Sequence, residues 1–373
     1  MFKSILISPN SFKECSDSIT ISELIDENLQ SELNQDFIMA PTSDGGDGFT
    51  EVCNYYFKGK KLSYIISKPY GNTSFECNIL YSQETKTVFI ESADALGLKI
   101  IPKEYRNPLL LSSKGLGEIF RHLEKEILPI EEVVIGIGGT GTIDMGLGAC
   151  SVFGFTLFDK YMREMEVIPE NFSKAESIKW ENYNLPFRIK FVLDVSNPLV
   201  GENGAIRVFG KQKGADEKAM AILESGFSNI LNLLKNKQFL DSSKQLSGAG
   251  GGIPAGFNIL FNSSNIIANE FILNNLGLKK QIELADLIIT GEGSFDSQSL
   301  MGKGAGVIVN EALKLGKDVI LICGKIEEEL KSSFGKNVNY FELQSYFKST
   351  EESIKDYKTG IKKVCEELVE MLK

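Results

Sequence analysis

The sequence has a single histidine, His122, among its 373 residues. Serine–histidine and cysteine–histidine nucleophile pairs, histidine-rich metal sites and a phosphohistidine intermediate would all depend on this one side chain. Its neighbours in residues 117–126 are typical of an exposed helical face, which does not favour a catalytic role. We therefore expect proton transfer in this protein to depend on aspartate, glutamate or lysine.

Cysteine pairs with metal-binding or disulfide spacing are also missing. The six cysteines include no Cys-x-x-Cys pair and no short zinc spacing, so we expect free thiols in a reducing compartment and a cytoplasmic protein. No apolar run approaches the roughly 18 residues of a membrane span, and no signal-peptide pattern is present. The net charge of −10 argues against nucleic acid or an anionic membrane as a partner.

The Walker phosphate loop, Gly-x-x-x-x-Gly-Lys-Ser/Thr, is absent, which excludes Walker-type nucleotide binding. Residues 136–141 do match the dinucleotide pattern Gly-x-Gly-x-x-Gly after an expected strand, and Asp159 lies near the position of a ribose-binding acid. Thr140, Thr142 and Asp144 nevertheless suit a phosphate and a metal better than a bare dinucleotide turn. A dinucleotide-dependent oxidoreductase is therefore only a minor alternative.

Short apolar runs that end in polar turns recur along the chain. They predict buried, mostly parallel strands at residues 3–8, 37–40, 133–137, 189–193, 287–289 and 319–323. Apolar residues at helical spacing follow the first two runs, whereas residues 62–91 are typical of short antiparallel strands. The alternation predicts an α/β fold with largely parallel sheets, whose ligands bind at the carboxyl ends of the strands.

The two ends of the chain share the same pattern of strands and helices. We therefore predict two α/β domains. One domain is discontinuous and combines residues 1–70 with residues 285–373, and the other is inserted between them as residues 71–284.

Five polar turns follow the expected strands, at residues 9–13, 43–48, 136–141, 194–198 and 290–293. Their glycines let backbone amides approach a phosphate, while aspartates can hold Mg²⁺ or accept a proton. Lys13 would bring an ammonium group to an anion near a helix N-terminus. Asp44 flanks two glycines, and Asp194 could aim a carboxylate into a cleft as a base or a metal ligand. This combination indicates a kinase that acts on a small molecule.

These segments, in this order and over nearly the whole chain, resemble the bacterial glycerate kinase family of the type without a P-loop. The matching blocks are residues 11–14, 44–48, 106–109, 136–139, 194–199, 209–215, 248–250 and 290–299. The resemblance implies two α/β domains with a cleft between them. It further implies that ATP and Mg²⁺ are used to phosphorylate D-glycerate to 2-phosphoglycerate or 3-phosphoglycerate. A homodimer is considered as the assembly.

The resemblance also implies an active site with Lys13, Asp44 and Asp194 as catalytic residues. In direct in-line transfer, Asp194 would orient or deprotonate the glycerate hydroxyl, and Lys13 would stabilise the transferring group. Arg106 would grip the glycerate carboxylate. The residues expected to bind substrate or phosphate are Asn10, Ser11, Arg106, Gly138, Gly139, Thr140, Asn197, Lys213, Gly291, Glu292 and Gly293, and Asp296 is the candidate metal ligand.

The chain departs from the family pattern at several of these turns. It has Asn10 where the family usually has aspartate, Ser294 in place of arginine, and Lys-Gly-Leu-Gly at 114–117 in place of Tyr-Gly-Thr-Gly. Residues 143–146 read Ile-Asp-Met-Gly in place of Asn-Asp-Gly-Gly, so Met145 replaces a glycine whose backbone would adopt a positive φ or approach a ligand. The alternative function is therefore a weak or inactive family member that binds a small organic acid as a sensor or regulatory partner.

Overall fold

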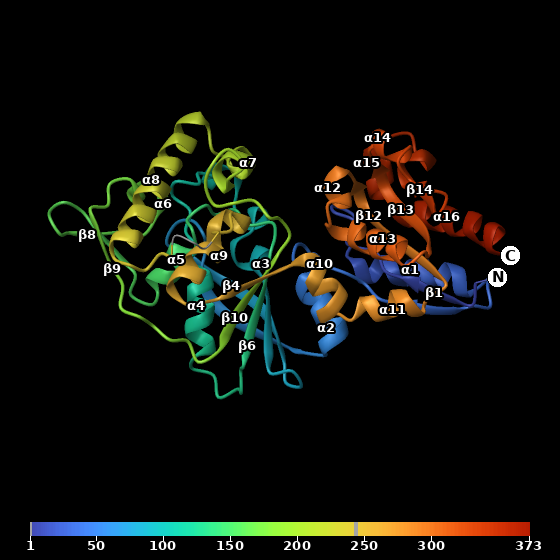
Figure 1. Ribbon diagram of the computed structural model, residues 1–373, viewed down its shortest axis with the longest axis horizontal. Coiled ribbons are helices and arrows are strands. Elements are labelled where there is room, and N and C mark those ends of the chain that lie inside the picture. The colour runs from blue at the N-terminus through green and yellow to red at the C-terminus, as the bar shows by residue number, and fades with distance from the viewer. Residues whose placement is uncertain (1, 242–244) are drawn as a thin grey trace. The chain divides into compact units, whose positions relative to one another are not determined.

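The computed structural model describes residues 2–241 and 245–373, and the chain divides into two compact units. Unit 1 combines Met1–Tyr56 with Ala268–Lys373, and unit 2 is Phe57–Ile267. Figure 1 shows the blue start and the red end of the chain in the same unit. Both crossings between the units come earlier than the predicted boundaries at residues 70 and 285. Strand β3 (Lys60–Ser67) already belongs to the sheet of unit 2, and the helices after Ile267 belong to unit 1.

Unit 1 is built on a five-stranded, fully parallel sheet with the order β14-β13-β12-β1-β2. Its strands are β1 (Ser4–Ile7), β2 (Asp36–Met39), β12 (Leu287–Phe295), β13 (Asp318–Ile326) and β14 (Val338–Glu342). Apolar side chains such as Leu6, Ile288 and Leu321 are completely buried in it. The predicted parallel strands at both ends of the chain therefore join one sheet.

Helices cover both faces of this sheet. Helix α1 (Ser18–Gln30) connects β1 to β2, and α13 (Gly304–Lys314) connects β12 to β13 in the opposite direction along the sheet. Since such crossovers are right-handed, the two helices lie on opposite faces. The strand order therefore reverses between β12 and β1, which is the place where open α/β sheets bind ligands.

The remaining helices of unit 1 are short, apart from α2 and α16. They are α2 (Phe49–Phe57), α10 (Ala268–Glu270), the π-helical turn η4 (Phe271–Asn275), α11 (Leu278–Leu284), α12 (Ser297–Leu300), α14 (Glu328–Lys331), η5 (Leu343–Tyr346), α15 (Thr350–Lys355) and α16 (Tyr357–Leu372). Helices α1 and α16 bury Ile21, Ile25, Ile361 and Leu368 in one cluster with the strand residue Ile7. This cluster is the core on one face of the sheet.

Unit 2 contains a six-stranded sheet with the order β11-β10-β6-β5-β4-β3. The parallel part comprises β5 (Thr87–Glu91), β6 (Glu132–Ile137), β10 (Arg188–Leu193) and β11 (Ser264–Ile267). Strand β4 (Ser74–Ser82) pairs antiparallel with β3 and with β5. The antiparallel pattern predicted for residues 62–91 is thus the edge of a mixed sheet.

The helices of unit 2 pack around an aromatic core. They are α3 (Ser92–Leu96), η1 (Leu98–Ile100), η2 (Lys103–Tyr105), α4 (Lys114–Leu123), α5 (Leu147–Ser151), α6 (Pro169–Phe172), α7 (Ala205–Phe209), η3 (Lys211–Lys213), α8 (Glu217–Asn236) and α9 (Ala249–Leu260). The Phe257 ring lies edge-on to Phe120 and Phe191, with centroids 5.3 and 5.5 Å apart. Such pairs add to the stabilisation that burial gives.

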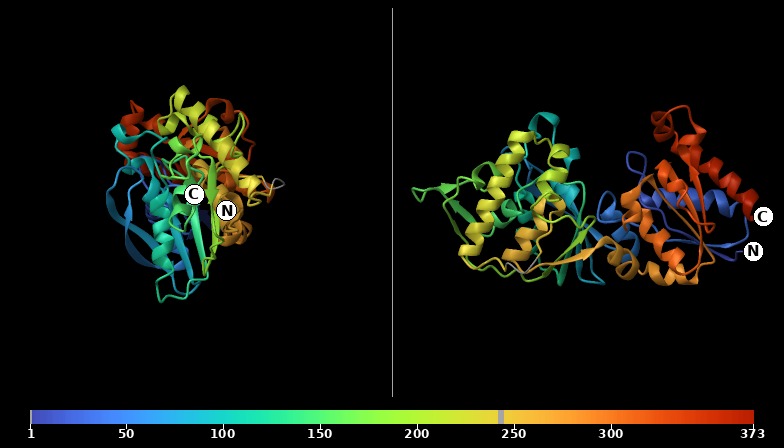
Figure 2. Two further views of the ribbon diagram at one scale, coloured as in Figure 1. Left: turned by 90° about the vertical axis from the view of Figure 1, so that its left-hand side faces the viewer. Right: turned by 45° about the horizontal axis from the view of Figure 1, so that its top comes forward.

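A small antiparallel sheet of unit 2 was not expected from the sequence. It consists of β7 (Thr156–Phe158), β8 (Glu164–Met165) and β9 (Ser177–Lys179), in the order β8-β7-β9. Figure 2 shows its hairpin at the margin of unit 2.

The structure also shows the surroundings of the single histidine and the state of the six cysteines. His122 lies on α4, as expected, but it is half-buried because its ring stacks on Tyr64 with centroids 4.9 Å apart. All six cysteines are free thiols. Within the two described ranges, no helix has both the length and the apolar character required to cross a membrane.

Candidate active site

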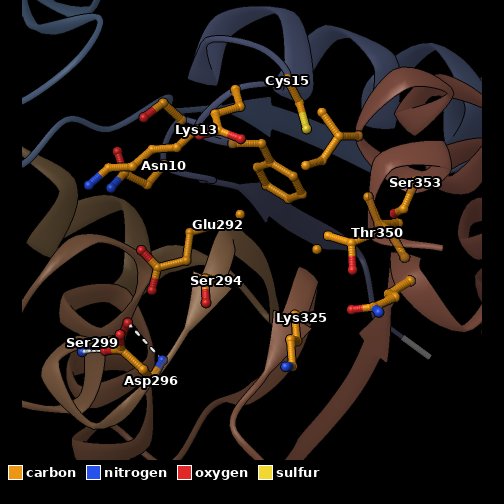
Figure 3. A pocket seen from close by; sticks show the side chains of 18 of the residues that line it. Asn10, Lys13, Cys15, Glu292, Ser294, Asp296, Ser299, Lys325, Thr350 and Ser353 are labelled. Atoms are coloured by element: carbon orange, nitrogen blue, oxygen red, sulfur yellow. Dashed lines mark hydrogen bonds between the residues drawn. The ribbon is translucent and has the colours of Figure 1, made fainter. Parts of the chain in front are cut away.

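Unit 1 has a cavity of about 410 Å³ at the carboxyl ends of its strands. Its walls come from the loops after β1 and β2 and from the ends of β12 and β13, beside the reversal of strand order. Predicted site residues that line it are Asn10, Ser11, Lys13, Asp44, Glu292, Gly293 and Asp296. Figure 3 shows Asn10, Lys13 and Glu292 from two segments distant in the sequence on one side of this cavity.

Backbone contacts hold the loop after β1 against β12. The amide of Asn10 donates a hydrogen bond of 2.8 Å to the carbonyl of Gly291. A Cβ atom at Gly293 would lie 3.1 Å from the backbone nitrogen of Lys13, so a glycine at this position permits the close approach of the two segments. The lysine is thereby brought to the same cavity as the carboxylates of β12.

The predicted turn at residues 290–293 is instead part of strand β12. Gly291 pairs with Ile322, and Glu292 pairs with Cys323 of β13. A Cβ at Gly291 would collide with the carbonyl of Ile322. The prediction of a turn was wrong because this glycine serves the close approach of two strands rather than a change of direction.

Glu292 is the most perturbed carboxyl group of the cavity. Burial, with a smaller contribution from the charges of Asp44 and Asp296, raises its pKa to about 8, although a hydrogen bond with Ser299 acts in the opposite direction. Its Oε1 and the nearby Oδ1 of Asn10 are both buried without a hydrogen-bond partner among the described residues. Buried oxygens of this kind are rarely left unpaired. They therefore indicate a place for a ligand donor or a cation.

Three lysines also line the cavity, namely Lys13, Lys303 and Lys325. Lys303 donates a hydrogen bond of 3.0 Å to the side-chain oxygen of Gln298. Lys13 and Lys325 are exposed, and within the described ranges neither amine has a hydrogen bond or ion pair. Both amines are therefore available to an anionic ligand.

The candidate metal ligand Asp296 serves as the N-cap of helix α12. Its Oδ1 accepts hydrogen bonds from the amides of Gln298 and Ser299 at 2.8 and 3.2 Å. In the described part of the chain, no three His, Cys, Asp or Glu side chains form a ready-made metal site. Mg²⁺ in kinases is commonly held by one or two carboxylates together with substrate phosphates. Glu292, with its unpartnered oxygen and with Asp44 nearby, fits that requirement.

Unit 2 has a second polar cluster in the loops after β6 and β10, which we call the Lys213 cluster. It consists of Lys213, Thr140, Thr142, Asp144 and Asp194. Lys213 is only 7% exposed, and its amine donates hydrogen bonds of 3.0 Å to the Thr140 hydroxyl and to the carbonyl of Thr142. Burial lowers the pKa of Lys213 to about 8, although the carboxylates of Asp194 and Asp144 act in the opposite direction. The structure thus brings three predicted residues, Lys213, Thr140 and Asp194, into one electrostatic environment.

Asp144 was placed in the turn by the sequence but not in the predicted site. It is fully buried, and it accepts hydrogen bonds from the Ser113 amide and hydroxyl, both at 2.7 Å. The amides of Gly146 and Gly148 add bonds of 3.0 and 3.2 Å. Burial raises the pKa of Asp144, against the effect of these hydrogen bonds. The sequence signal that could have identified Asp144 as a site residue is its position, as an acid inside a glycine turn that follows a buried strand.

Two predicted binding residues are engaged in holding loops. The guanidinium of Arg106 donates to the carbonyls of Ile101 and Leu98 at 3.0 and 2.9 Å. The side-chain amide of Asn197 donates to the carbonyl of Asn203 at 2.9 Å. Both contacts stabilise loops near the Lys213 cluster.

The glycine turn after β6 lacks the features of a dinucleotide site. The carbonyls of Gly138 and Gly139 accept hydrogen bonds from the Ser92 hydroxyl and the Leu98 amide at 3.4 and 3.1 Å. The following helix, α5, begins at Leu147, several residues after Gly141, the last glycine of the pattern. In a dinucleotide-binding fold the helix would begin within the glycine turn itself. Asp159 instead accepts a hydrogen bond from an arginine of its own hairpin.

Comparison with known proteins agrees with the resemblance seen in the sequence. The model of the glycerate kinase family matches residues 5–373. A glycerate kinase from Neisseria meningitidis serogroup B is 30% identical over 357 residues, which cover 94% of each chain. The glycerate 2-kinase of Escherichia coli K12 is 32% identical over 334 residues, 87% of this chain and 86% of the relative.

A crystal structure of a candidate glycerate kinase 2 from Salmonella typhimurium LT2 is similar in fold. It has 26% sequence identity and a TM-score of 0.79, and the match covers 100% of this chain and 98% of the other. This likeness confirms the predicted α/β fold class. From the family match over residues 5–373 and from relatives at 30% identity or more, the chain belongs to the glycerate kinase family.

Proposed function

We propose that this protein is an ATP-dependent glycerate kinase that transfers the γ-phosphoryl group of ATP to D-glycerate. Family membership and the names of the relatives support the reaction. The observation that carries the proposal is the cavity of unit 1, which is lined by both Lys13 and the buried carboxyl of Glu292 and contains two unpartnered oxygens, Glu292 Oε1 and Asn10 Oδ1. Phosphoryl transfer needs positioning and charge neutralisation more than covalent chemistry, and this cavity offers both signs of charge.

The residues of the unit 1 cavity are assigned to the phosphoryl group. The ammonium of Lys13 neutralises negative charge on the transferring group, as fixed cations do in phosphoryl transfer. Glu292 with Asp44 or Asp296 would hold Mg²⁺. When bound, this ion shields the charge of the phosphate oxygens.

The Lys213 cluster of unit 2 is assigned to glycerate. The buried amine of Lys213 suits the glycerate carboxylate, and Thr142 has a buried hydroxyl without a partner among the described residues. Arg106, the residue first expected to grip this carboxylate, already donates to two backbone carbonyls. Asp194 orients the glycerate hydroxyl or takes its proton, as a carboxylate general base does.

The 2-hydroxyl group of D-glycerate is the proposed acceptor, because one relative is named glycerate 2-kinase. Proton-coupled ³¹P NMR of the product distinguishes the two hydroxyls. Phosphate on the 2-oxygen couples to one proton and gives a doublet, whereas phosphate on the 3-oxygen couples to two protons and gives a triplet. A triplet would contradict this acceptor and leave the kinase activity intact.

Two substitutions test the catalytic assignments. We expect Asp194→Asn to lower kcat by about 10²- to 10⁴-fold and Lys13→Ala by about 10²-fold or more. Neither side chain belongs to an apolar core, so the melting temperature should change little. Steady-state turnover with MgATP and D-glycerate, together with thermal denaturation, measures both effects. Full turnover in the two variants would contradict these roles.

A second candidate function is binding of a small organic acid without turnover. It is favoured by Ser294, which lines the cavity at a position where the family usually has arginine. Calorimetric binding of D-glycerate, without any phosphate ester signal in the ³¹P spectrum, would identify such a protein. Phosphoryl transfer to D-glycerate would exclude it.

A further inference from the structure

We propose that the cavity of unit 1 is the nucleotide site. One end would hold the magnesium-bound triphosphate, and the opposite end, built from residues 343–354, would hold the base. This assignment rests on the proposed kinase function and adds to it the location and the chemical class of one substrate.

The position of the cavity in the fold supports a nucleotide. The connections after β1 and β12 leave in opposite directions, so a crevice opens between the carboxyl ends of these neighbouring strands. Doubly wound sheets commonly bind nucleotides in such a crevice. Residues 10–15, which follow β1, and residues 292–299, at the end of β12, both line the cavity.

The size of the cavity also favours a nucleotide over glycerate. A volume of about 410 Å³ lies within the roughly 300–1,000 Å³ typical of pockets that enclose drug-sized ligands. Glycerate is much smaller and would leave most of this space to water.

The charged end matches a triphosphate with a divalent cation. Lys13 and Lys303 supply positive charge for phosphate oxygens, as lysine does at other phosphate sites. The buried and unpartnered oxygens of Glu292 and Asn10 are acceptors, and they require a cation or a donor rather than another anion. Lysines and unpartnered acceptors together fit a metal-bound polyphosphate better than a lone carboxylate.

The opposite end has the character of a base-binding wall. It is formed by η5 and α15, where Leu343 and Ile354 contribute apolar surface. Figure 3 shows Thr350 and Ser353 across the cavity from Asn10 and Glu292, so their hydroxyls lie far from the charged end. The side-chain amide of Gln344 can both donate and accept hydrogen bonds, which suits the edge of a purine.

Substitutions at this wall test the assignment. Thr350→Trp would fill the base end, and Gln344→Ala would remove the amide. Glu351→Gln changes an exposed neighbour that does not line the cavity and serves as the control. Calorimetry with MgADP measures binding directly, and steady-state kinetics give KM for MgATP and for D-glycerate separately.

We expect Thr350→Trp to weaken MgADP binding by more than about tenfold, and Gln344→Ala by about threefold to tenfold, the loss of one or two hydrogen bonds. The control should stay within about twofold. KM for D-glycerate should remain within about twofold in all three variants, because no wall residue belongs to the Lys213 cluster. Magnesium tripolyphosphate, which lacks a base, should still bind to Thr350→Trp but not to Lys13→Ala.

Two results would overturn the assignment. One is wild-type affinity for MgADP in a folded Thr350→Trp variant, and the other is a rise in KM for D-glycerate in place of KM for MgATP. In either case turnover of D-glycerate by the wild type would leave the proposed function standing. If the wild type bound MgADP as expected but never phosphorylated D-glycerate, the nucleotide site would stand and the proposed function would fail.

Discussion

Burial in the fold strongly shifts the pKa values of two candidate site groups, the carboxyl of Glu292 and the amine of Lys213. Burial moves both pKa values to about 8, upward from an ordinary 4.5 for Glu292 and downward from 10.5 for Lys213. Each group can therefore exchange a proton near neutral pH. Perturbed groups of this kind gather at functional sites, which agrees with the roles proposed for them.

Replacing Glu292 by glutamine should stabilise the protein and reduce its activity. A carboxyl whose folded-state pKa is raised contributes stability below its unfolded pKa, near 4.5, and loses that contribution as the pH rises through about 8. Glutamine has the same shape and no charge, so the stability advantage of Glu292→Gln should grow between pH 6 and pH 9 by on the order of 3 kcal/mol. Thermal denaturation at both pH values measures this difference.

The activity of Glu292→Gln distinguishes a role of Glu292 in catalysis from a role in stability alone. We expect kcat of Glu292→Gln to fall by about 10²-fold or more, because the amide has no negative charge with which to hold Mg²⁺. The exposed Glu351→Gln is the matched control and should change neither property. A stability difference that is independent of pH would contradict the buried, proton-binding state of Glu292.

Binding of D-glycerate should weaken above pH 8 if Lys213 holds its carboxylate. The lowered pKa means that the amine loses its proton as the pH rises through about 8, and the neutral amine no longer attracts an anion. We expect Kd to rise toward tenfold per pH unit above that point. Calorimetric titration with D-glycerate from pH 7 to 9.5 avoids any effect of Glu292 on turnover.

The variant Lys213→Met supplies the control for this pH dependence. It should bind D-glycerate weakly at every pH, without the alkaline loss. A wild-type Kd that stays constant up to pH 9.5 would remove Lys213 from the acceptor site.

At the scale of elements, the loop after β6 is held against an unusual helix start. Gly250, Gly251 and Gly252 at the beginning of α9 all have positive φ, and the Met145 amide donates to the Gly251 carbonyl at 3.1 Å. A Cβ at Gly251 would collide with the carbonyl of Thr142. The glycines therefore let this loop lie directly on the helix, next to the Lys213 cluster.

Met145 itself has a φ of 56°, the left-handed conformation that its sequence position predicted, and it is fully buried. Replacing it by glycine relieves about 1 kcal/mol of backbone strain but removes a buried side chain that contributes about 2–4 kcal/mol. We expect Met145→Gly to lower the free energy of unfolding by about 1–3 kcal/mol, as measured by urea denaturation.

The chain offers a matched control for this substitution. Met162 has a φ of 60° but is 68% exposed, so Met162→Gly relieves the same kind of strain without emptying a core. Its stability should stay within about 1 kcal/mol of the wild type. A Met145→Gly variant more stable than the wild type would show that the backbone strain at Met145 costs more free energy than its buried side chain contributes.

The strands were more predictable from the sequence than the turns. Continuous apolar runs identify β1, β6 and β10 because a strand buried on both faces excludes polar residues. The glycines of residues 290–293 look the same locally whether they end a strand or lie within one, and only the pairing with β13 decides between the two. Strands β7, β8 and β9 have only two or three residues each, too few to show alternation.

The candidate site was predictable where its residues lie at or just beyond the carboxyl ends of strands of one sheet. Lys13, Asp44 and Glu292 line one cavity for this reason. The partners of Asp144 could not be foreseen, because Ser113 is distant in the sequence and only the fold brings its amide to that carboxylate. The predicted cleft between the domains stays a prediction.

At the scale of the whole molecule, both ends of the chain belong to unit 1. Helices α1 and α16 share one buried cluster on the parallel sheet, with Ile21 and Ile25 from the first and Ile361 and Leu368 from the last. Unit 2 has a separate core of its own. The start of the chain thus depends on its end for a complete core.

Removal of residues 357–373, which include α16, should therefore unfold unit 1 and spare unit 2. Exposing the apolar face of α1 and of the sheet costs more than a marginally stable unit can lose. Limited proteolysis of the shortened chain should leave a resistant fragment close to Phe57–Ile267, and mass spectrometry identifies its ends. Protease resistance of the whole shortened chain would contradict a shared core.

Formation of ADP from MgATP by the purified full-length protein, with D-glycerate as the acceptor, tests the kinase assignment most directly. We expect ADP and phosphoglycerate to form in equal amounts with D-glycerate, and only background ADP with L-glycerate or without an acceptor. The Asp194→Asn variant should remain near that background. A folded wild-type protein that binds D-glycerate but forms no ADP would contradict the assignment and favour the function of binding alone.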